Sequence, residues 1–127
     1  VRAGARLVAT NDDATFPTPD GLIPGGGAIL AGIATAAGVA PEVAGKPYAP
    51  MAALVRAVTG HSDLTDAVMV GDRPDTDGRM AVALGCRYAQ VRSGVTAPGV
   101  TVRPAPWLDV ADLAAVADHL LVRTGPM

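Results

Sequence analysis

The stretch AVMVGDRPDTD, residues 67–77, decides the fold of this chain. Its first four residues, 67–70, are wholly apolar, which predicts a central strand of a parallel sheet, buried on both faces. Three carboxylates follow it within six residues, at Asp72, Asp75 and Asp77. In an open α/β sheet, ligands bind at the carboxyl ends of the strands, and carboxylates this close together need a cation or hydrogen bonds to hold them. Mg²⁺, usually bound by one or two carboxylates plus waters and phosphate, suits this loop. An acidic turn in which one aspartate caps the next helix is the alternative.

The elements around this stretch alternate between strands and helices. Apolar residues at positions 51, 54, 55 and 58 predict a helix over 50–59 that ends at Gly60. Further elements are expected as a helix to about Leu84, a strand over 87–91, a short strand at 107–108, and a last helix capped by Asp109 with Leu113, Val116 and Leu120 facing inward. From residue 42 onward this order predicts an α/β fold, with a parallel sheet and helices on both of its faces.

The first 41 residues are organised differently. A short buried strand is expected at 6–10, and the polar turn Asn11-Asp12-Asp13 follows it. Residues 14–27 are rich in proline and glycine, which predicts a loop, and the glycine run 25–27 fits either an anion cradle or a joint before a helix. A helix over 28–37 with Gly38 at its end, and a brief strand over 42–44, complete this part.

Composition excludes several classes of function. The chain has 127 residues, enough for one ordinary domain, with 50% hydrophobic residues and a net charge of −2. No basic, aromatic-rich stripe indicates a nucleic-acid partner, and no apolar run approaches the roughly 20 residues of a membrane span. Cys86 is the single cysteine, which excludes an internal disulfide. No signal peptide is visible, so a cytoplasmic location is expected, although the first residue is Val1 and not methionine.

Lys46 is the single lysine of the chain, against nine arginines. It lies between Gly45 and Pro47, after the strand predicted at 42–44. Because lysine is a compact point charge and arginine a planar fork, a site shaped for one rarely accepts the other. The position therefore favours an ammonium group that pairs with a phosphate or a carboxylate over a solvated surface lysine.

Three segments together resemble a known family: ATNDDATFPTPDGLIPGGGAIL (9–30), VAGKP (43–47) and VMVGDRPDTD (68–77). They resemble, in order, parts of the class IIA haloacid-dehalogenase (HAD)-like phosphatases, which include phosphoglycolate, glycerol-3-phosphate and pyridoxal phosphate phosphatases. The chain is similar to the C-terminal half of these phosphatases. The resemblance implies that residues 1–41 end an α/β cap domain and that 42–127 form the C-terminal half of a Rossmann-like core.

The resemblance also implies roles for individual residues. Lys46 would steady a nucleophilic carboxylate and the phosphate, and Asp72 would bind Mg²⁺ with Asp77 as its hydrogen-bonding or water-mediated partner. The segment with Asn11, Asp13 and Phe16 corresponds to the cap loop that selects the substrate. Asn11 also begins a sequence shaped like the family's Asp-x-Asp-x-Thr motif, but an amide cannot form an acyl phosphate, so that alignment is rejected. No Asp-x-Asp-Gly nucleophile motif and no threonine motif is identified anywhere in the 127 residues, so the chain alone is not expected to turn over.

Two functional classes follow. The first is a Mg²⁺-dependent hydrolase of a small phosphorylated metabolite, of the glycerol phosphate or phosphoglycolate kind. Its N-terminal half would come from the same chain or another one, with a strand ending in Asp-x-Asp-Gly about 150 residues before Val1, and a homodimer is left open. The second is an inactive stand-alone remnant that acts as a binding or scaffold domain.

Overall fold

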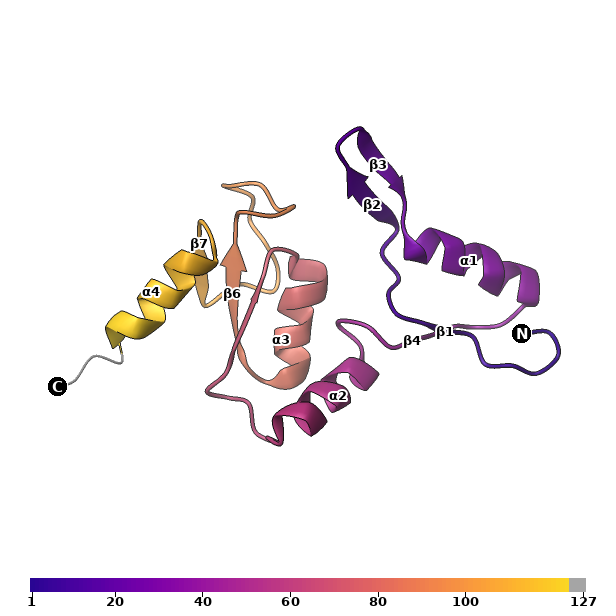
Figure 1. Ribbon diagram of the computed structural model, residues 1–127, viewed down its shortest axis with the longest axis horizontal. Coiled ribbons are helices and arrows are strands. Elements are labelled where there is room, and N and C mark those ends of the chain that lie inside the picture. The colour runs from indigo at the N-terminus through magenta and orange to yellow at the C-terminus, as the bar shows by residue number, and fades with distance from the viewer. Residues whose placement is uncertain (124–127) are drawn as a thin grey trace. The chain divides into compact units, whose positions relative to one another are not determined.

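The computed structural model describes residues 1–123, which form two compact units that divide after Met51 (Figure 1). The first unit carries strands β1 to β4 and helix α1, and the second carries the acidic stretch. Helix α2 (Ala49–Thr59) begins in the first unit and continues into the second. Each unit is described by itself below.

A three-stranded parallel sheet is the centre of the second unit. Its order is β5 (Val68–Gly71), β6 (Arg87–Val91) and β7 (Leu108–Val110), with Val70 opposite Ala89 and Ala89 opposite Leu108. The connection from β5 to β6 runs through a π-helical turn η1 (Pro74–Gly78) and helix α3 (Arg79–Leu84). Helix α4 (Leu113–Arg123) follows β7. The fold class predicted from the sequence, a parallel sheet with flanking helices, is confirmed.

The two faces of β6 have different neighbours, because successive side chains of a strand point to opposite sides. Ala89 and Val91 form the core together with Val116 of α4. Tyr88 and Gln90 lie on the other face, where a Cβ at Gly78 would lie 2.9 Å from Pro104 and 3.0 Å from the ring of Tyr88. In Figure 1, β6 lies between α3 and α4.

The first unit contains two small sheets and one helix. Strands β1 (Val8–Ala9) and β4 (Glu42–Val43) pair in parallel, and β2 (Thr15–Thr18) and β3 (Gly21–Pro24) form an antiparallel hairpin. Helix α1 (Gly26–Ala37) ends at Gly38, whose left-handed φ of 68° suits a glycine. The predicted end of this helix and the predicted strand at 42–44 are confirmed.

Residues 14–27 are not the irregular loop that their prolines and glycines predicted. The turn of the hairpin is closed by the Thr18 hydroxyl, which donates to the Gly21 carbonyl at 2.7 Å. Gly21 has a φ of 124°, which only glycine adopts readily. Pro17 and Pro24 are tolerated because each lies in a two-stranded hairpin, where one edge of every strand needs no partner. The proline content masked a strand signal in Thr15-Phe16 and Leu22-Ile23.

Among the residues described, β5 pairs with β6 alone. Two further predictions were wrong in detail. The strand expected to be buried at 6–10 is short, and Val8 is 53% exposed. Helix α4 is capped by Asp112, whose side chain accepts the Ala115 amide at 2.9 Å, because Asp109 already belongs to β7.

The inward face predicted for α4 is only partly right. Val116 is buried and Leu120 packs against the core, but Leu113 is 64% exposed. No helix within residues 1–123 combines the length and the apolar character that crossing a membrane requires.

Candidate active site

Asp72 directly follows β5 and is held by the segment that follows β6. The Val95 amide donates to its Oδ2 at 2.8 Å. Its main-chain oxygen accepts two hydrogen bonds, from Gln90 Nε2 at 3.1 Å and from the Thr96 hydroxyl at 2.5 Å. Neighbouring strands of a parallel sheet end at the same edge, which explains why residues 72 and 95 meet.

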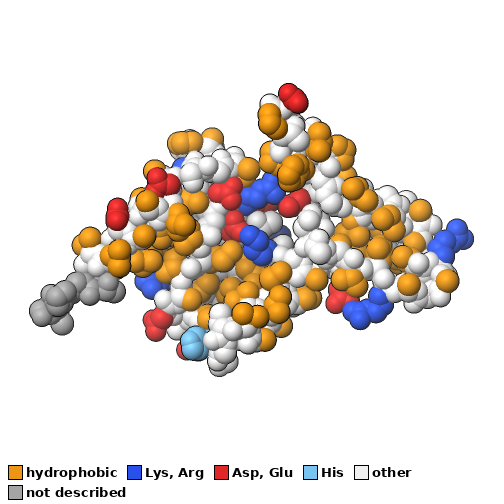
Figure 2. All heavy atoms as spheres, in the orientation of Figure 1, with side chains coloured by type: hydrophobic (Ala, Val, Ile, Leu, Met, Phe, Trp, Pro, Cys, Tyr) orange, Lys and Arg blue, Asp and Glu red, His pale blue; other side chains and the backbone are white. Residues whose placement is uncertain are grey.

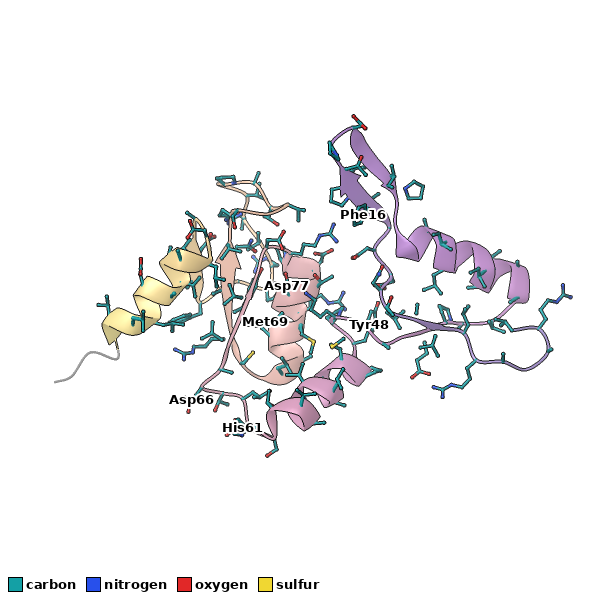
Figure 3. The ribbon with its side chains drawn as sticks, viewed as in Figure 1. Phe16, Tyr48, His61, Asp66, Met69 and Asp77 are labelled. Carbon is teal, nitrogen blue, oxygen red and sulfur yellow. The ribbon has the colours of Figure 1, made fainter. Side chains whose placement is uncertain are left out.

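Asp77 is 4% exposed and lies inside the turn η1 (Figure 3). Its Oδ2 accepts the Arg73 amide at 3.1 Å, and its own amide donates to the Arg73 carbonyl at 2.7 Å. This arrangement orders the acidic loop around a buried carboxylate. No side-chain hydrogen bond caps η1 or α3, so the alternative of an aspartate that caps the next helix is not observed.

Glycine is required where the two carboxylates pack. A Cβ at Gly71 would lie 2.1 Å from Asp77 Oδ2, and a Cβ at Gly94 would lie 2.0 Å from Asp72 Oδ2. Both distances are far below van der Waals contact. The two glycines therefore leave the space in which the carboxylates of Asp72 and Asp77 lie.

Tyr88 lies beside the end of β5, with its hydroxyl 3.5 Å from the Gly71 carbonyl oxygen. Burial, followed by the negative charges of Asp77 and Asp72, raises the pKa of its phenol from 10.0 to about 12. Its hydroxyl donates to Gln90 Oε1 at 2.5 Å. The Asp77 carboxylate packs against Gly71, the last residue of β5, and Asp72 follows that residue directly, so both aspartates lie at the carboxyl end of β5.

The donor set of this loop fits a hard cation. Carboxylate oxygens are the ligands that Mg²⁺ prefers, and Mg²⁺ commonly takes only one or two of them from protein. Within residues 1–123 no group of three or more His, Cys, Asp or Glu side chains is arranged to hold a metal. Asp72 would hold Mg²⁺, with Asp77 as its hydrogen-bonding or water-mediated partner, and this role of the loop as a metal site stays a prediction.

The tetrapeptide Asp75-Thr76-Asp77-Gly78 spells Asp-x-Asp-Gly, contrary to the expectation that this motif is absent from the chain. It does not have the position expected of a nucleophile motif, at the end of an apolar strand. Asp75 lies four residues beyond Gly71, exposed in η1, and Asp77 is buried. Neither carboxylate is the first residue after a strand.

Lys46 lies in the first unit, in a turn between β4 and α2. The Tyr48 amide donates to the Gly45 carbonyl at 2.9 Å and closes the turn, and the Lys46–Pro47 peptide is cis. Gly45 is buried, and a Cβ there would lie 1.9 Å from the Thr10 carbonyl oxygen. The backbone that carries Lys46 is therefore packed, whereas the lysine itself is exposed.

The residues predicted for substrate selection also lie in the first unit. Asn11 Oδ1 accepts the Asp13 amide at 3.2 Å and packs against Gly26. Phe16 is in strand β2 opposite Ile23, and its ring is 60% exposed (Figure 3). The hairpin thus presents Phe16 on its surface, and its part in substrate selection stays a prediction.

The glycine run before α1 is explained by packing. The Gly25 amide donates to the Ala14 carbonyl at 2.9 Å, and the Gly27 amide donates to the Asp13 carbonyl at 2.8 Å. A Cβ at Gly27 would lie 2.1 Å from the Asp12 carbonyl oxygen. Because the amides of Gly25 and Gly27 already donate to backbone carbonyls, the glycine run fits a joint between a loop and a helix better than an anion-binding site.

Sequence reasoning missed Gln90, Tyr88 and the segment 94–96. The signal that could have found Gln90 is an amide in the middle of an otherwise apolar strand, in YAQV at 88–91. Buried polar side chains need partners. Those partners are distant in sequence, so only the structure identifies them.

Comparison with known proteins places the chain in a family. Residues 43–121 match the HAD-hydrolase-like family. The D-glycerol 3-phosphate phosphatase of Mycobacterium tuberculosis is 47% identical over 95 residues, which are 75% of this chain and 26% of that protein. The dihydroxyacetone phosphatase of Corynebacterium glutamicum is 34% identical over 119 residues, which are 93% of this chain and 42% of that protein.

Solved structures agree. The crystal structure of glycerol phosphate phosphatase from Mycobacterium tuberculosis in complex with magnesium superposes with a TM-score of 0.74 at 38% identity, covering 91% of this chain and 35% of that one. The chain thus spans less than half the length of these relatives. It belongs to the HAD-like hydrolases, in the class IIA phosphatase branch that its sequence resembles.

Proposed function

We propose that the complete protein is a Mg²⁺-dependent hydrolase of small phosphomonoesters, and that this chain supplies Lys46, Asp72 and Asp77 to its site. The observation that carries the proposal is the acidic loop at the carboxyl end of β5. There the carboxylate of Asp72 is held at one oxygen by the Val95 amide, beside the buried Asp77. A magnesium complex of a related phosphatase supports the choice of metal.

Each residue has a distinct role in this proposal. Asp72 binds the metal, and Asp77 orders the loop through the Arg73 amide. Lys46 provides a positive charge for the phosphate and for the attacking carboxylate. When bound, Mg²⁺ neutralises the charge of the transferring phosphoryl group. The chemistry also needs a carboxylate nucleophile, which we assign to a segment outside these residues, in the same chain or a partner chain.

The substrate that we propose is a small phosphorylated metabolite of the glycerol phosphate or phosphoglycolate kind. Relatives named as phosphatases of D-glycerol 3-phosphate, dihydroxyacetone and acid sugars support this size class. We further propose that residues 1–41 belong to a cap domain and 42–127 to the core. In that division the hairpin with Phe16 contacts the part of the substrate that leaves.

The test is phosphate release by the complete protein from glycerol 3-phosphate, phosphoglycolate and pyridoxal phosphate, with Mg²⁺ and with a chelator. Mg²⁺-dependent release from one of the first two is expected. Binding of these compounds without any hydrolysis would contradict the proposal and favour the alternative, an inactive domain that binds or scaffolds.

A further inference from the structure

The amide of Gln90 is fully buried on β6, on the face opposite the apolar core. Its Nε2 donates to the carbonyl oxygens of Asp72 at 3.1 Å and Val91 at 2.6 Å. Its Oε1 accepts the Tyr88 hydroxyl. Since the side chain faces two carbonyls on one side and a phenol on the other, only this orientation of the amide satisfies all three partners.

The carbonyl oxygen of Asp72 has a second donor. The hydroxyl of Thr96, which is only half-buried, bonds to the same oxygen at 2.5 Å. A carbonyl oxygen has two lone pairs, and both are used here. The peptide that follows Asp72 is therefore held from two sides, by β6 and by the segment beyond it.

The carboxylate of Asp72 is held at one oxygen only. Oδ2 accepts the Val95 amide, and no residue within 1–123 donates to Oδ1. Because residue 94 is a glycine and has no side chain, the Asp72 carboxylate can pack directly against its backbone. With the main chain and Oδ2 both held, the direction in which Oδ1 points is determined by residues 90, 94, 95 and 96.

We propose that Gln90 and Thr96 are positioning residues, which hold the main-chain oxygen of Asp72 so that Oδ1 is the oxygen offered to the metal. The inference rests on the proposed function, because it takes Asp72 as the metal ligand. Neither residue touches the metal or the substrate. Partners of this kind around metal ligands change metal affinity when they are removed.

The experiment is a calorimetric titration of the complete protein with Mg²⁺ in saturating inorganic phosphate. Thr96→Val removes the hydroxyl and keeps the shape, and Gln90→Met removes the amide. Both are expected to raise the Mg²⁺ dissociation constant about tenfold, while Thr96→Ser, which keeps the donor, binds as the wild type does. Val116→Ala is the matched control, because it opens the core on the opposite face of the sheet and is expected to lower the melting temperature without changing the affinity.

The outcomes separate the inference from the proposed function. Wild-type Mg²⁺ affinity in Thr96→Val and Gln90→Met, together with lost affinity in Asp72→Asn, overturns the inference and leaves the proposed function standing. An equal loss of affinity in Val116→Ala also overturns it, because destabilisation alone would then explain the effect. A wild-type protein that binds no Mg²⁺, or an Asp72→Asn variant that binds it unchanged, contradicts the proposed function itself.

Discussion

Glycine at position 94 leaves the space that the Asp72 carboxylate fills, and glycine at 71 does the same for Asp77. Neither has the left-handed backbone that usually explains a glycine. Their requirement comes from close approach, which no pattern in the sequence reveals. The two glycines therefore belong to the site as much as the carboxylates do.

Gly94→Ala should displace the Asp72 carboxylate, because the added Cβ would lie 2.0 Å from Oδ2 and 2.5 Å from the Cβ of Asp72. We expect the Mg²⁺ concentration needed for half-maximal phosphate release by the complete protein to rise about tenfold or more. Gly32→Ala in helix α1 is the control, since nothing lies within 4 Å of its Cβ position. Unchanged Mg²⁺ dependence in Gly94→Ala would show that the close approach of residue 94 to the Asp72 carboxylate is not needed for metal binding.

Lys46→Arg keeps the positive charge but replaces the compact ammonium group with a wider, planar guanidinium. The turn that carries Lys46 is packed through Gly45, so the backbone cannot shift freely to fit a wider group. We expect kcat of the complete protein to fall on the order of 100-fold, because groups aimed at a transferring phosphate commonly contribute this much. The exposed Arg2→Lys change is the control. Wild-type kinetics for Lys46→Arg would make Lys46 an ordinary surface residue.

The phenol of Tyr88 should remain protonated well into the alkaline range. Its pKa is raised from 10.0 to about 12, mainly by burial and then by Asp77 and Asp72. The unfolded chain releases this proton first, so the contribution to stability is complete below pH 10 and is lost as the pH rises towards about 12. Tyr88→Phe should flatten the loss of stability between these values, as measured by denaturant unfolding. A difference absorbance titration against this variant with its midpoint near the ordinary value would contradict the burial of the group.

Among the elements, the segment after β6 matters most for the site, and Arg92 organises it. Its guanidinium donates to Asp109 of β7 at 2.7 Å through Nε, and to the carbonyls of Ala97 at 2.8 Å and Val100 at 3.0 Å. The Arg92 side chain is 11% exposed. Hydrogen bonds from this arginine lower the pKa of the Asp109 carboxyl. The segment that carries Val95 and Thr96 is thus tied to β7.

Arg92→Lys should loosen this segment, because an ammonium group cannot reproduce the planar fork that reaches Asp109 and both carbonyls at once. We expect faster amide hydrogen exchange over residues 93–102, with exchange in β5 unchanged. Arg79→Lys on the exposed side of α3 is the control. Unchanged exchange over 93–102 would show that the loop is ordered without Arg92.

Elements with a clear hydrophobic periodicity, or with a glycine that marks their end, were predictable from the sequence. Strand β6 was placed at 87–91 as observed, and α1 and α2 were found from their apolar spacing and from Gly38 and Gly60. The hairpin of β2 and β3 was missed because proline and glycine outweighed two short apolar pairs. Within the site, the acidic residues were visible as a cluster. The partners of Asp72 were not, because they come from positions 90, 95 and 96 and meet it only after β5 and β6 pair.

At the scale of the whole molecule, both units leave large apolar side chains exposed. In the second unit, which has a core of Ala89, Val91 and Val116, the exposed residues include Leu54, Val58 and Val82. In the first unit they lie over the hairpin and α1 (Figure 2): Phe16, Leu22, Ile23, Ile29 and Ile33. Exposed apolar surface of this extent is typical of a surface that contacts another part of a protein or a ligand. This agrees with the proposal that the chain functions as part of a larger protein.

The most direct test of the proposed function is phosphate release from glycerol 3-phosphate by the complete protein and its Asp72→Asn variant across a Mg²⁺ titration. Asparagine keeps the shape of the side chain and removes its charge, so a folded variant with weakened metal binding is expected. The account predicts Mg²⁺-dependent release by the wild type and a loss of activity in Asp72→Asn at ordinary Mg²⁺ concentrations, with an unchanged circular dichroism spectrum. Activity that persists in Asp72→Asn at the same Mg²⁺ concentration would contradict the assignment of the acidic loop as the metal site.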